Sequence, residues 1–531
     1  MNAERLLLHY ERTADARDAI PRLRRFILDL AVRGKLVTQD ANDEPAPELL
    51  RQITKEELDQ TGLPRGWCRV RLGSILEFQY GKGLKASERL DEGPVPVFGS
   101  NGIVGFTDTP LTIHPSIIVG RKGSAGALNL CDGPSWTTDV AYFVEAPSFL
   151  NLRFLLSALT ALDLDKLGKG VKPGLSRSEA YEQIFAVPPL TEQRRIVAKV
   201  DELMGLCDQL EAARHTREAA RDRLAAASLT RLNAPNPETF SADARFALDA
   251  LPAITTRPDQ IKQLRQTILN LAVRGKLVPQ DPNDEPASEL LKLIAEEKAR
   301  LVKDGKSRRN DALPEINLDQ APFELPVGWT WARFPELGTF GRGKSKHRPR
   351  NDPALFEGGE HLMIQTGDVA RSQGVIETYT NKYNDFGLAQ SLKWPTGTLC
   401  ITIAANIADS GILSFDACFP DSVVGFIPAS MFDSARYFEY FVRTAKANLL
   451  EFAPATAQKN INLEILTQVL IPLPPLAEQN RIIAKIDALM ALCDRLEASL
   501  TYSADTRRRL LDALLAEALA PFKAVQLEAA E

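Results

Sequence analysis

Two nearly identical stretches of sequence, 241 residues apart, constrain this chain more than any other feature. Residues 27–50 are ILDLAVRGKLVTQDANDEPAPELL and residues 268–291 are ILNLAVRGKLVPQDPNDEPASELL, with 20 of 24 positions identical. A second pair, residues 190–212 and 476–498, repeats LTEQRRIVAKVDELMGLCDQLEA as LAEQNRIIAKIDALMALCDRLEA. The segments that these repeats enclose barely resemble each other. Because an internal repeat fixes the architecture, the sequence predicts one frame that is used twice to hold two different inserts.

The second repeated pair predicts two long helices. Apolar residues alternate at spacings of four and three at Ile196, Val200, Leu203, Cys207 and Leu210, and again at Ile482, Ile486, Leu489, Cys493, Leu496 and Leu500. This spacing is typical of a coiled coil and requires a partner helix. Each segment continues for about 40 residues, or roughly 60 Å of helix. The pattern weakens at Arg214, Arg217 and Arg221, where a bend or a different neighbour would fit.

The first repeated pair also predicts helices, with Leu23, Ile27, Leu30 and Ala31 on one apolar face. Gly34 stands where the C-terminus of a helix favours a residue that tolerates positive φ, and Gly275 repeats this arrangement. The neighbouring cations would then lie near the negative end of the helix dipole. The pattern Arg-Gly-Lys therefore predicts a helix end rather than a chemical site.

The inserts have a different pattern. Short apolar runs are separated by Gly, Pro, Asn and Asp, which predicts strands: VPVFG, SIIVG and VAYFV in the first insert, TLCITIA and VVGFIP in the second. Each insert ends in a helical stretch, at residues 150–162 and 432–450. The predicted fold is α+β, with two compact α+β domains separated by long, duplicated, coiled-coil-like helical regions that have pseudo-twofold symmetry. Its predicted parts are an N-terminal helical segment (1–63), the first insert (64–188), a central helical spacer (189–322), the second insert (323–474) and a C-terminal helical spacer (475–531).

Composition limits the classes of protein. The net charge of −5 counts against a nucleic-acid binder, although a local basic stripe is enough to bind phosphate. Six scattered cysteines without a Cys-x-x-Cys pair, and five histidines without metal-ligand spacing, predict neither disulfides nor a zinc site. We see no signal peptide and no run near the ~20 apolar residues of a membrane span. The expected location is the cytoplasm.

Residues 338–345, GTFGRGKS, fit the phosphate-loop pattern G-x-x-x-x-G-K-[ST]. A working phosphate loop leaves a buried strand and opens a helix. Here Pro335 interrupts the preceding run, and Pro349 and Pro353 oppose a helix afterwards. No acidic partner for magnesium stands out. The match therefore does not predict nucleotide hydrolysis.

The same stretch contains a row of alternating cations: Arg342, Lys344, Lys346, Arg348 and Arg350. In an extended segment alternating side chains share one face. Such a row suits the phosphates of a nucleic acid, whose neutralisation gives salt-dependent affinity. A solvated surface loop explains the same residues, and both interpretations stay open. At the corresponding place the first insert has a weaker series, Gln79, Tyr80, Lys82 and Lys85.

Further candidate DNA contacts follow the run SIIVG, at Arg121, Lys122 and Ser124. Arginine recognises guanine through two hydrogen bonds in the major groove, and the intervening Gly123 lets the backbone come close. A plain hairpin turn accounts for these residues equally well. Candidates of the same kind occupy matching loops near the ends of the inserts: Lys169 and Lys172 in the first, Gln458, Lys459 and Asn460 in the second.

Catalytic motifs are missing from the sequence. There is no G-x-S-x-G, no H-E-x-x-H and no G-x-G-x-x-G after a strand. The Asn-Pro-Pro-aromatic tetrapeptide, with which amino-methylating DNA enzymes hold a flipped base, does not occur either. The sequence therefore favours a binding protein over an enzyme.

Taken together and in this order, the repeated motifs resemble those of the specificity subunits of type I restriction–modification systems, over nearly the whole chain. Leu-Pro-x-Gly-Trp precedes each insert, at residues 63–67 and 325–329. Pro-Pro-Leu-x-Glu-Gln follows each insert, at residues 188–193 and 474–479. AVRGKLV stands ahead of each of these pairs, at residues 31–37 and 272–278. The runs FGSNG, IIVGRKGSAG, IQTGDV and TLCITIAANIADSGIL are similar to sequence of target-recognition domains. This similarity adds Asn101 and Gln365 to the candidate DNA contacts.

The resemblance implies a DNA-binding chain without chemistry or cofactors of its own. Each insert would be a target-recognition domain for one half of a split double-stranded DNA site, and the helices would set the gap between the halves. The helices would also dock two modification (methyltransferase) subunits, which carry S-adenosylmethionine and methylate adenine. A restriction subunit that uses ATP and magnesium would join them to cleave unmethylated DNA.

Two expectations about the target follow. Since the inserts differ, the predicted target is asymmetric and bipartite. Half-sites about one helical turn apart, roughly 34–36 Å, would be met on one face of the duplex.

Three other functions stay open from the sequence. One is the specificity chain of a type II system with a fused methylase–nuclease partner, which neighbouring genes would distinguish. Another is a helical scaffold that presents two modules to something other than DNA; poor retention on DNA would favour it. The last is an NTPase, which would be favoured if a Lys344→Ala variant lost ATP turnover.

Overall fold

A computed structural model describes residues 16, 18–55, 58–168, 174–233, 238–304, 313–318, 321–404, 408–448 and 463–519 of the 531-residue chain. The chain divides into two units, residues 1–219 with 502–531, and residues 220–501. The divisions fall inside two 44-residue helices, α8 (Leu190–Asn233) and α17 (Leu476–Leu519). These are the two long helices that the apolar spacing predicts.

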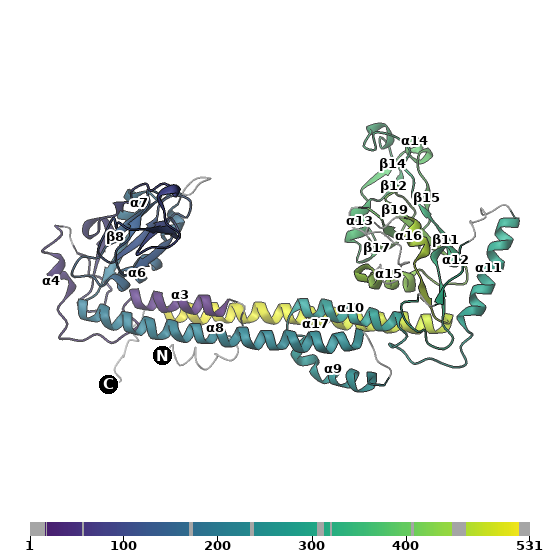
Figure 1. Cartoon of the computed structure of the whole chain (residues 1–531), viewed down its shortest axis with the longest axis horizontal. Helices are drawn as coiled ribbons and strands as arrows, with labels where there is room; N and C mark the ends of the chain where they lie inside the picture. Colours follow the sequence, from purple (N-terminus) through teal and green to yellow (C-terminus); the bar gives the residue numbers. More distant parts are fainter. Residues whose placement is uncertain are drawn as a thin grey trace, which may run out of the picture. The chain divides into compact units, whose positions relative to one another are not determined.

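The frame of the first unit contains α3 (Ala19–Val32), the short α4 (Ala46–Leu50), the first part of α8 and the last part of α17. Helix α3 runs beside α8 (Figure 1), and Ile27 shares a buried core with Ile196 and Cys207. Arg24 of α3 lies 2.7 Å from both Asp208 and Glu211 of α8. The predicted apolar face is thus confirmed up to Cys207.

The apolar face of α8 ends earlier than the spacing indicates. Leu210 is 38% exposed, so its assignment to the buried seam is wrong. Buried positions return only near the end of the helix, at Ala225, Leu229 and Leu232, beyond the arginine-rich stretch. The neighbours of α8 change along its length: Ile196 and Cys207 share a core with Ile27 of α3, whereas Ala225 and Leu229 pack with α9 in the second unit. Leu210 lies between these two cores and belongs to neither.

The C-terminal part of α17 completes the frame of the first unit. Leu511 and Leu515 pack against Ala16 and Ala19 in a small apolar cluster. Arg22 forms an ion pair with Asp512, and the Lys35 ammonium donates to the carbonyl of Leu519 at 3.0 Å. The last part of α17 therefore packs on the N-terminal helix of the first unit.

The first insert consists of three small sheets and the helices that cover them. Strand β1 (Cys68–Arg71) pairs antiparallel with β9 (Ile184–Val187) and so joins the two ends of the insert. A four-stranded sheet has the order β2-β8-β5-β6: Gln79–Tyr80, Ala141–Glu145, Ser116–Gly120 and Leu128–Cys131. A three-stranded sheet has the order β4-β3-β7: Gly102–Thr107, Val95–Gly99 and Trp136–Thr137.

Short helices surround these sheets: α5 (Leu72–Ile75), η1 (Ala86–Glu88), α6 (Leu152–Ala161), η2 (Leu164–Leu167) and α7 (Arg177–Tyr181). Helix α6 packs on α3. At the C-terminal end of α6, Arg25 of α3 donates to the carbonyls of Thr160 and Ala161 and lies 2.6 Å from Asp163. This cation stands at the negative end of a helix dipole, where it is favoured, and it ties the insert to the frame.

The second unit repeats the frame with additions. Helices α10 (Pro258–Val273) and α11 (Ala287–Lys303) correspond to α3 and α4, and α9 (Phe240–Ile254) precedes them. Arg265 lies 2.6 Å from Asp494 and 2.7 Å from Glu497, at the positions that correspond to the Arg24 contacts. The end of α8 belongs to this unit, where Asn233 accepts a 2.9 Å bond from Asn270 of α10.

In the second insert, β10 (Thr330–Ala332) pairs with β20 (Ile471–Leu473), as β1 does with β9. A five-stranded sheet has the order β11-β19-β16-β17-β13: Gly338–Arg342, Val423–Pro428, Leu399–Thr402, Ser410–Leu413 and Gly374–Ile376. A four-stranded sheet has the order β14-β12-β18-β15: Asn381–Tyr383, His361–Met363, Ala417–Cys418 and Lys393–Trp394. The predicted α+β class, with two sheet-containing domains and long duplicated helices, is confirmed.

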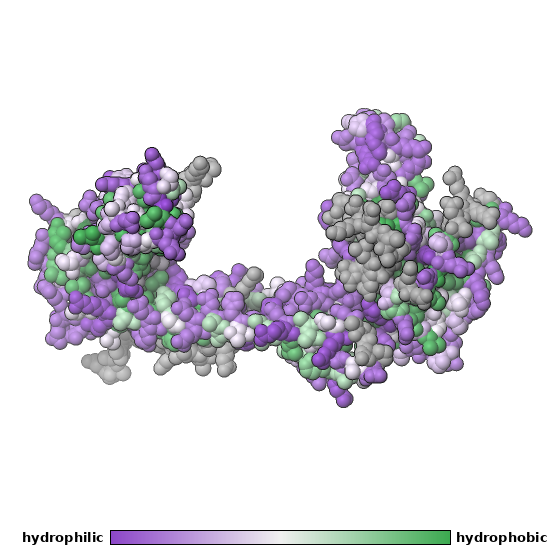
Figure 2. Space-filling model, viewed as in Figure 1, coloured by the Kyte–Doolittle hydropathy of each residue, from purple (hydrophilic) through white to green (hydrophobic). Residues whose placement is uncertain are grey.

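The helices of the second insert are α12 (Phe334–Leu337), η4 (Pro353–Leu355), α13 (Thr366–Arg371), α14 (Asp385–Ala389), α15 (Arg436–Asn448) and α16 (Leu463–Gln468). Helix α15 packs on α10. On the face shown in Figure 2, the part of this insert around α14 is mostly hydrophilic, although Phe386 of α14 is 47% exposed. It forms a polar lobe on the four-stranded sheet.

Candidate nucleic-acid interface

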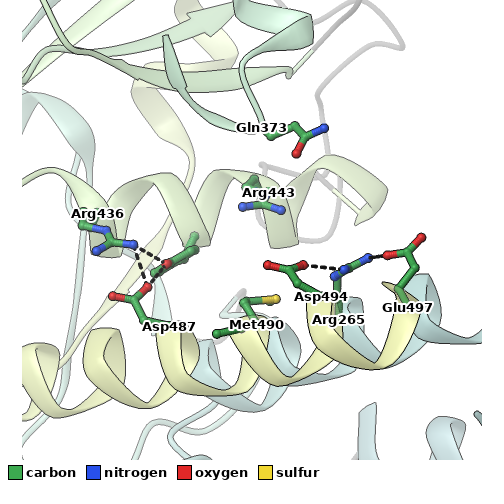
Figure 3. Close-up of a pocket in the computed structure, with 10 residues that line it drawn as sticks. Arg265, Gln373, Arg436, Arg443, Asp487, Met490, Asp494 and Glu497 are labelled. Carbon is green, nitrogen blue, oxygen red and sulfur yellow. Dashed lines mark hydrogen bonds and ion pairs between the residues drawn. The ribbon is translucent and has the colours of Figure 1, made fainter. Parts of the chain in front are cut away.

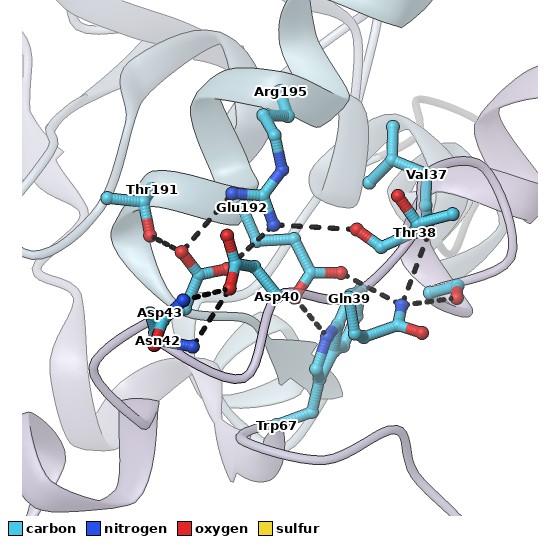
Figure 4. Close-up of polar contacts among 11 residues, drawn as sticks. Val37, Thr38, Gln39, Asp40, Asn42, Asp43, Trp67, Thr191, Glu192 and Arg195 are labelled. Atoms are coloured by element: carbon cyan, nitrogen blue, oxygen red, sulfur yellow. Dashed lines mark hydrogen bonds and ion pairs between the residues drawn. The ribbon is translucent and has the colours of Figure 1, made fainter.

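The repeated motifs meet in a polar joint between each insert and its helices, and Figure 4 shows the joint of the first unit. In the first unit the indole N–H of Trp67 donates to Glu192 at 3.0 Å, and the amide of Gln39 donates to its other carboxylate oxygen at 3.0 Å. Trp67 is fully buried and Glu192 is 1% exposed. Burial raises the pKa of Glu192, and the two donors oppose this rise.

The second unit builds the same joint from the repeated residues. Trp329 donates to Glu478 at 2.9 Å, and Gln280 donates to the same carboxylate at 3.1 Å. Burial raises the pKa of Glu478 as well. The Leu-Pro-x-Gly-Trp and Pro-Pro-Leu-x-Glu-Gln motifs are therefore parts of a structural joint, and they leave the inserts free to differ.

An ion pair lies beside each joint. Arg195 binds Asp43 through contacts of 2.6 and 3.2 Å, and Arg481 binds Asp284 with the same distances. The bond from Arg195 lowers the pKa of Asp43. Both ion pairs join α8 or α17 to the loop after AVRGKL, so the helices and the loops are held in one arrangement in each unit.

The arginine–glycine–lysine pattern is a helix end, as predicted. Helix α3 ends at Val32 and α10 ends at Val273, and Gly34 and Gly275 adopt φ values of 65° and 64°. A side chain on Gly34 would come within 2.5 Å of the Pro64 ring, and one on Gly275 would meet Pro326 at 2.4 Å. Glycine is thus required both for the backbone and for the close approach of the Leu-Pro-x-Gly-Trp loop.

Several predicted contacts of the first insert lie together at one edge, where three loops converge. Arg121 and Lys122 donate backbone hydrogen bonds to Val140, and the backbone of Lys82 donates to Thr137. Lys82, Asn101 and Lys122 are exposed, and Ser124 is half-buried in the same β5–β6 turn. The predicted hairpin turn is present, and it carries its basic residues to the surface.

A stacked group of aromatic and cationic side chains stands at this edge. The guanidinium carbon of Arg121 lies 4.9 Å from the centre of the Tyr80 ring, and that of Arg177 lies 4.3 Å from it. Tyr80 also packs against Tyr142, at 5.1 Å between ring centres. A guanidinium group over the face of an aromatic ring is attracted to that ring. Tyr80 remains 47% exposed.

Arg177 was not among the candidates from the sequence. It begins α7, and its guanidinium donates to the carbonyl of Phe78 at 3.3 Å. No local pattern marks it, because its approach to Tyr80 depends on packing of distant segments. The other predicted residues of this series do not contact the stacked group: Gln79 is half-buried within β2, and Lys85 is exposed directly before η1.

The five-cation row of the second insert alternates only in part. Arg342, Lys344, Lys346, Arg348 and Arg350 are all exposed, and Gly343, Ser345 and His347 between them are buried or half-buried, but Pro349 is exposed and the chain bends from residue 347 on. Within the part of the chain that the structure describes, two of the five have side-chain partners: Arg350 lies 2.6 Å from Asp421, and Arg348 donates to the carbonyls of Ser345 and His347. The remaining three present their charges to solvent.

The phosphate-loop pattern at the same place has no phosphate-loop geometry. The backbone N–H groups of Gly343 and Lys344 donate to the carbonyls of Val423 and Phe419. A side chain on Gly343 would come within 2.3 Å of the Phe419 carbonyl oxygen. Because the segment continues β11 and opens no helix, the glycines serve packing.

Gln365 is exposed directly before α13. The preceding Ile364 donates to Cys418 and Lys344 donates to Phe419, so the segment of Gln365 and the cation row flank one short strand. Five other predicted contacts lie outside the residues that the structure describes: Lys169, Lys172, Gln458, Lys459 and Asn460.

A cavity of about 680 Å³ in the second unit is lined by charged residues of α10, α15 and α17 (Figure 3). Arg436 lies 2.6 Å from Asp487, which joins α15 to α17. Glu439 of α15 is 3% exposed, and burial raises its pKa to about 7. Since Arg265 and Arg436 are paired with acids, we interpret this cavity as a polar attachment of the insert to its helices.

Among the described residues no cluster of histidine, cysteine and acidic side chains could hold a metal ion. Within that same part of the chain no helix is both long and apolar enough to span a membrane. The six cysteines are buried and unpaired.

A duplicated helical frame with two unlike α+β inserts, each bearing exposed cations, defines a protein with two separate binding modules. A family model described as type I restriction modification DNA specificity domain matches residues 64–217 and 326–502. The chain is 30% identical to the type I restriction enzyme EcoEI specificity subunit and 28% identical to its EcoAI counterpart, both from Escherichia coli. These alignments cover 94% and 93% of both chains.

Two solved structures are also similar. The HsdS subunit from Thermoanaerobacter tengcongensis has 18% identity and a TM-score of 0.43, covering 86% of this chain and 97% of that one. A chain from a study of assembly and conformational transition of the type I R-M system has 17% identity and a TM-score of 0.48, covering 87% and 99%.

The chain belongs to the family of type I restriction–modification DNA specificity subunits. The resemblance expected from the sequence is thereby confirmed. So is the expectation of a recognition chain that leaves catalysis to other subunits.

Proposed function

We propose that this chain selects the DNA target of a type I restriction–modification complex, with each insert contacting one half of an asymmetric, bipartite site. The observation that carries the proposal is the pair of identical joints around two unlike inserts. A constant frame with two different inserts suits a protein that binds two DNA half-sites, because the half-sites differ in base sequence but lie on one sugar–phosphate backbone. Residues 64–188 and 323–474 are the proposed target-recognition domains.

The proposed DNA contacts are the exposed edge of the first insert and the cation row of the second. In the first, Tyr80, Arg121 and Arg177 offer stacking and hydrogen-bonding groups beside Lys82 and Lys122. In the second, Arg342, Lys344 and Lys346 suit consecutive phosphates. Phosphate contacts position a protein on the duplex, whereas base contacts specify the sequence, so the two groups have different proposed roles.

Two modification subunits are the proposed partners of the long helices. Leu206 of α8 is 47% exposed and Leu492, its equivalent in α17, is 51% exposed. Exposed leucines at equivalent positions of a duplicated frame would suit two copies of one partner. These subunits would supply S-adenosylmethionine, and restriction subunits would supply ATP and magnesium, with the whole complex in the cytoplasm.

The docking proposal has a direct test. Leu206→Asp and Leu492→Asp should each remove one modification subunit, and the double variant should remove both, as native mass spectrometry of the assembled complex would record. Leu293→Asp, at a residue of α11 that is 45% exposed, is the matched control. Full assembly of the double variant would contradict this assignment.

Mapping of methylated adenines across the genome, with and without this gene, tests the target. The proposal expects one asymmetric bipartite motif, modified on both strands, that disappears with the gene. A single palindromic motif would contradict two different half-sites. A methylation pattern that does not depend on the gene would contradict the function itself.

A further inference from the structure

The stacked group at the edge of the first insert contains two cations without an acidic partner. The guanidinium carbons of Arg121 and Arg177 lie 4.9 and 4.3 Å from the centre of the Tyr80 ring. Both arginines are half-buried, and among the residues that the structure describes neither forms an ion pair with a carboxylate. A charge that is partly withdrawn from water is costly unless something balances it. The group therefore suits a ligand that supplies hydrogen-bond acceptors.

The orientation of the Arg121 guanidinium is fixed from several sides. Its Nη1 donates to the carbonyl of Asp139 at 3.1 Å. Besides Tyr80, the ring of Tyr142 lies 5.9 Å from its guanidinium carbon. The backbone carbonyl of Arg121 accepts a 2.9 Å bond from the N–H of Leu175. The bond to Asp139 uses only part of the donor set of a guanidinium, so the remaining donors keep a fixed direction.

Arg177 holds the ring on which Arg121 stacks. Its Nη1 donates to the carbonyl of Phe78 at 3.3 Å, and its guanidinium lies over Tyr80 in the same segment. The N–H of Phe78 donates to the hydroxyl of Tyr181 at 2.9 Å. Arg177 and Tyr181 both belong to α7. This helix therefore anchors the segment that contains Tyr80.

A cation with a preset plane suits a different contact from a mobile one. The exposed Lys82 and Lys122 beside this group suit phosphates, which need only a nearby charge. A guanidinium held in one plane matches a flat edge with two adjacent acceptors, and it loses little freedom on binding. In the major groove guanine presents such an edge, with O6 and N7. We propose that Tyr80 and Arg177 are positioning residues that hold Arg121 in the plane of a guanine, which makes a G·C pair part of the first half-site.

This inference rests on the proposed DNA-binding function and deepens it. A rival use of the Arg121 guanidinium is a contact with a phosphate, which carries no sequence information. The contact with guanine needs the N7 acceptor, whereas the contact with a phosphate does not. In 7-deazaguanine a C–H group replaces N7 and the pairing with cytosine is kept, so this base distinguishes the two uses.

The test uses the chain assembled with its modification subunits, after its site has been mapped. Each guanine of the first half-site, on either strand, is replaced in turn by 7-deazaguanine, and the Kd is measured by fluorescence anisotropy. One replacement should weaken binding roughly ten-fold, the effect of one lost hydrogen bond to a charged group. Replacements in the second half-site should have the same effect with the unaltered chain and with an Arg121→Ala chain.

Two variants assign the effect to Arg121. In an Arg121→Ala chain the sensitive position should become indifferent to 7-deazaguanine. Arg89→Ala is the matched control, because Arg89 is a half-buried arginine of the same insert whose guanidinium donates twice to the carbonyl of Leu84. The Arg89→Ala chain should keep the ten-fold effect.

The positioning role has its own readout, which is the ratio of affinities for guanine and 7-deazaguanine at the sensitive position. Tyr80→Ala and Arg177→Ala should each lower this ratio toward one. Tyr80→Phe keeps the ring and should retain the ratio. A merely structural defect would lower the active fraction of the complex and leave the ratio unchanged, so an unchanged ratio in both alanine variants would overturn the positioning role.

Three results would overturn the contact itself: a first half-site without a guanine, indifference to 7-deazaguanine at every position of that half-site, or an effect that persists in the Arg121→Ala chain. Because the 7-deazaguanine duplexes are tested with the unaltered chain, the second result does not depend on how the variants fold. Loss of preference for the mapped site in the unaltered complex would instead contradict the proposed function.

Discussion

Replacing Arg342, Lys344 and Lys346 together by alanine should weaken DNA binding without changing the preferred sequence. All five cations of the row are exposed, but Arg350 is paired with Asp421 and Arg348 donates to the carbonyls of Ser345 and His347. Cations that neutralise phosphates contribute through the release of counterions, which is independent of the base sequence. The variant should therefore lose affinity for specific and non-specific duplexes in the same proportion.

The size of the loss follows from the number of unpaired cations. Each phosphate contact changes the slope of log affinity against log salt by about 0.9, so three contacts should make it shallower by roughly 2.7. At about 0.15 M salt each contact contributes roughly 0.7 logarithmic units, so affinity should fall about a hundred-fold. Arg350→Ala is the matched control, because its charge is already balanced by Asp421, and its effect on the slope should be well below 0.9.

The assay is a fluorescence-anisotropy titration of the assembled complex against labelled duplex at several salt concentrations. The slope is the decisive quantity, because a folding defect lowers the active fraction and leaves the slope unchanged. An unaltered slope in the triple variant would refute the assignment of this row to phosphates. A changed sequence preference would show that the row contacts bases instead.

The two joints and one buried acid give further predictions. Trp67→Phe and Trp329→Phe should each destabilise their own unit by about 2 kcal/mol, since a buried carboxylate loses a hydrogen-bond donor. Hydrogen exchange measured separately for the two units would show this loss. Equal destabilisation of both units by one substitution would contradict the prediction. The pKa of Glu439 is raised to about 7 from the ordinary 4.5, so in the folded chain its carboxyl group is mostly protonated below about pH 7. The contribution of Glu439 to the stability of the second unit should be largest below pH 4.5 and should fall by about 3 kcal/mol as the pH rises through about 7. Glu439→Gln should remove most of this dependence in thermal unfolding, and a pH profile unaffected by the substitution would exclude Glu439 as its cause.

The helices and many of the strands follow from local sequence. The runs VPVFG, SIIVG and VVGFIP are β3, β5 and β19 with the expected bounds, because branched and aromatic residues between turn formers have few alternatives. Gly34 marks the end of its helix for a local reason as well, because its positive φ excludes most other residues. Local patterns succeed where one residue's own backbone decides the outcome.

Contacts between distant segments were beyond such patterns. The exposure of Leu210 depends on which positions of α8 reach the cores shared with α3 and with α9, and the position of Arg177 over Tyr80 depends on the packing of α7. The repeated Trp and Glu residues were recognised as motifs, yet their bond was not predicted, because 125 residues separate them. Among the candidate contacts, the row that starts at Arg342 alternates as expected as far as Arg348, because that part needed only an extended backbone, and the alternation ends where the chain bends around Pro349.

The central claim is that the frame and the inserts are independent, and an exchange of inserts tests it most directly. A chain in which residues 64–188 are replaced by a second copy of residues 323–474 keeps both joints and carries one kind of insert. Adenine methylation mapping in a strain that expresses this chain should return a symmetric site, built from two inverted copies of the present second half-site. An unchanged asymmetric motif would contradict the claim.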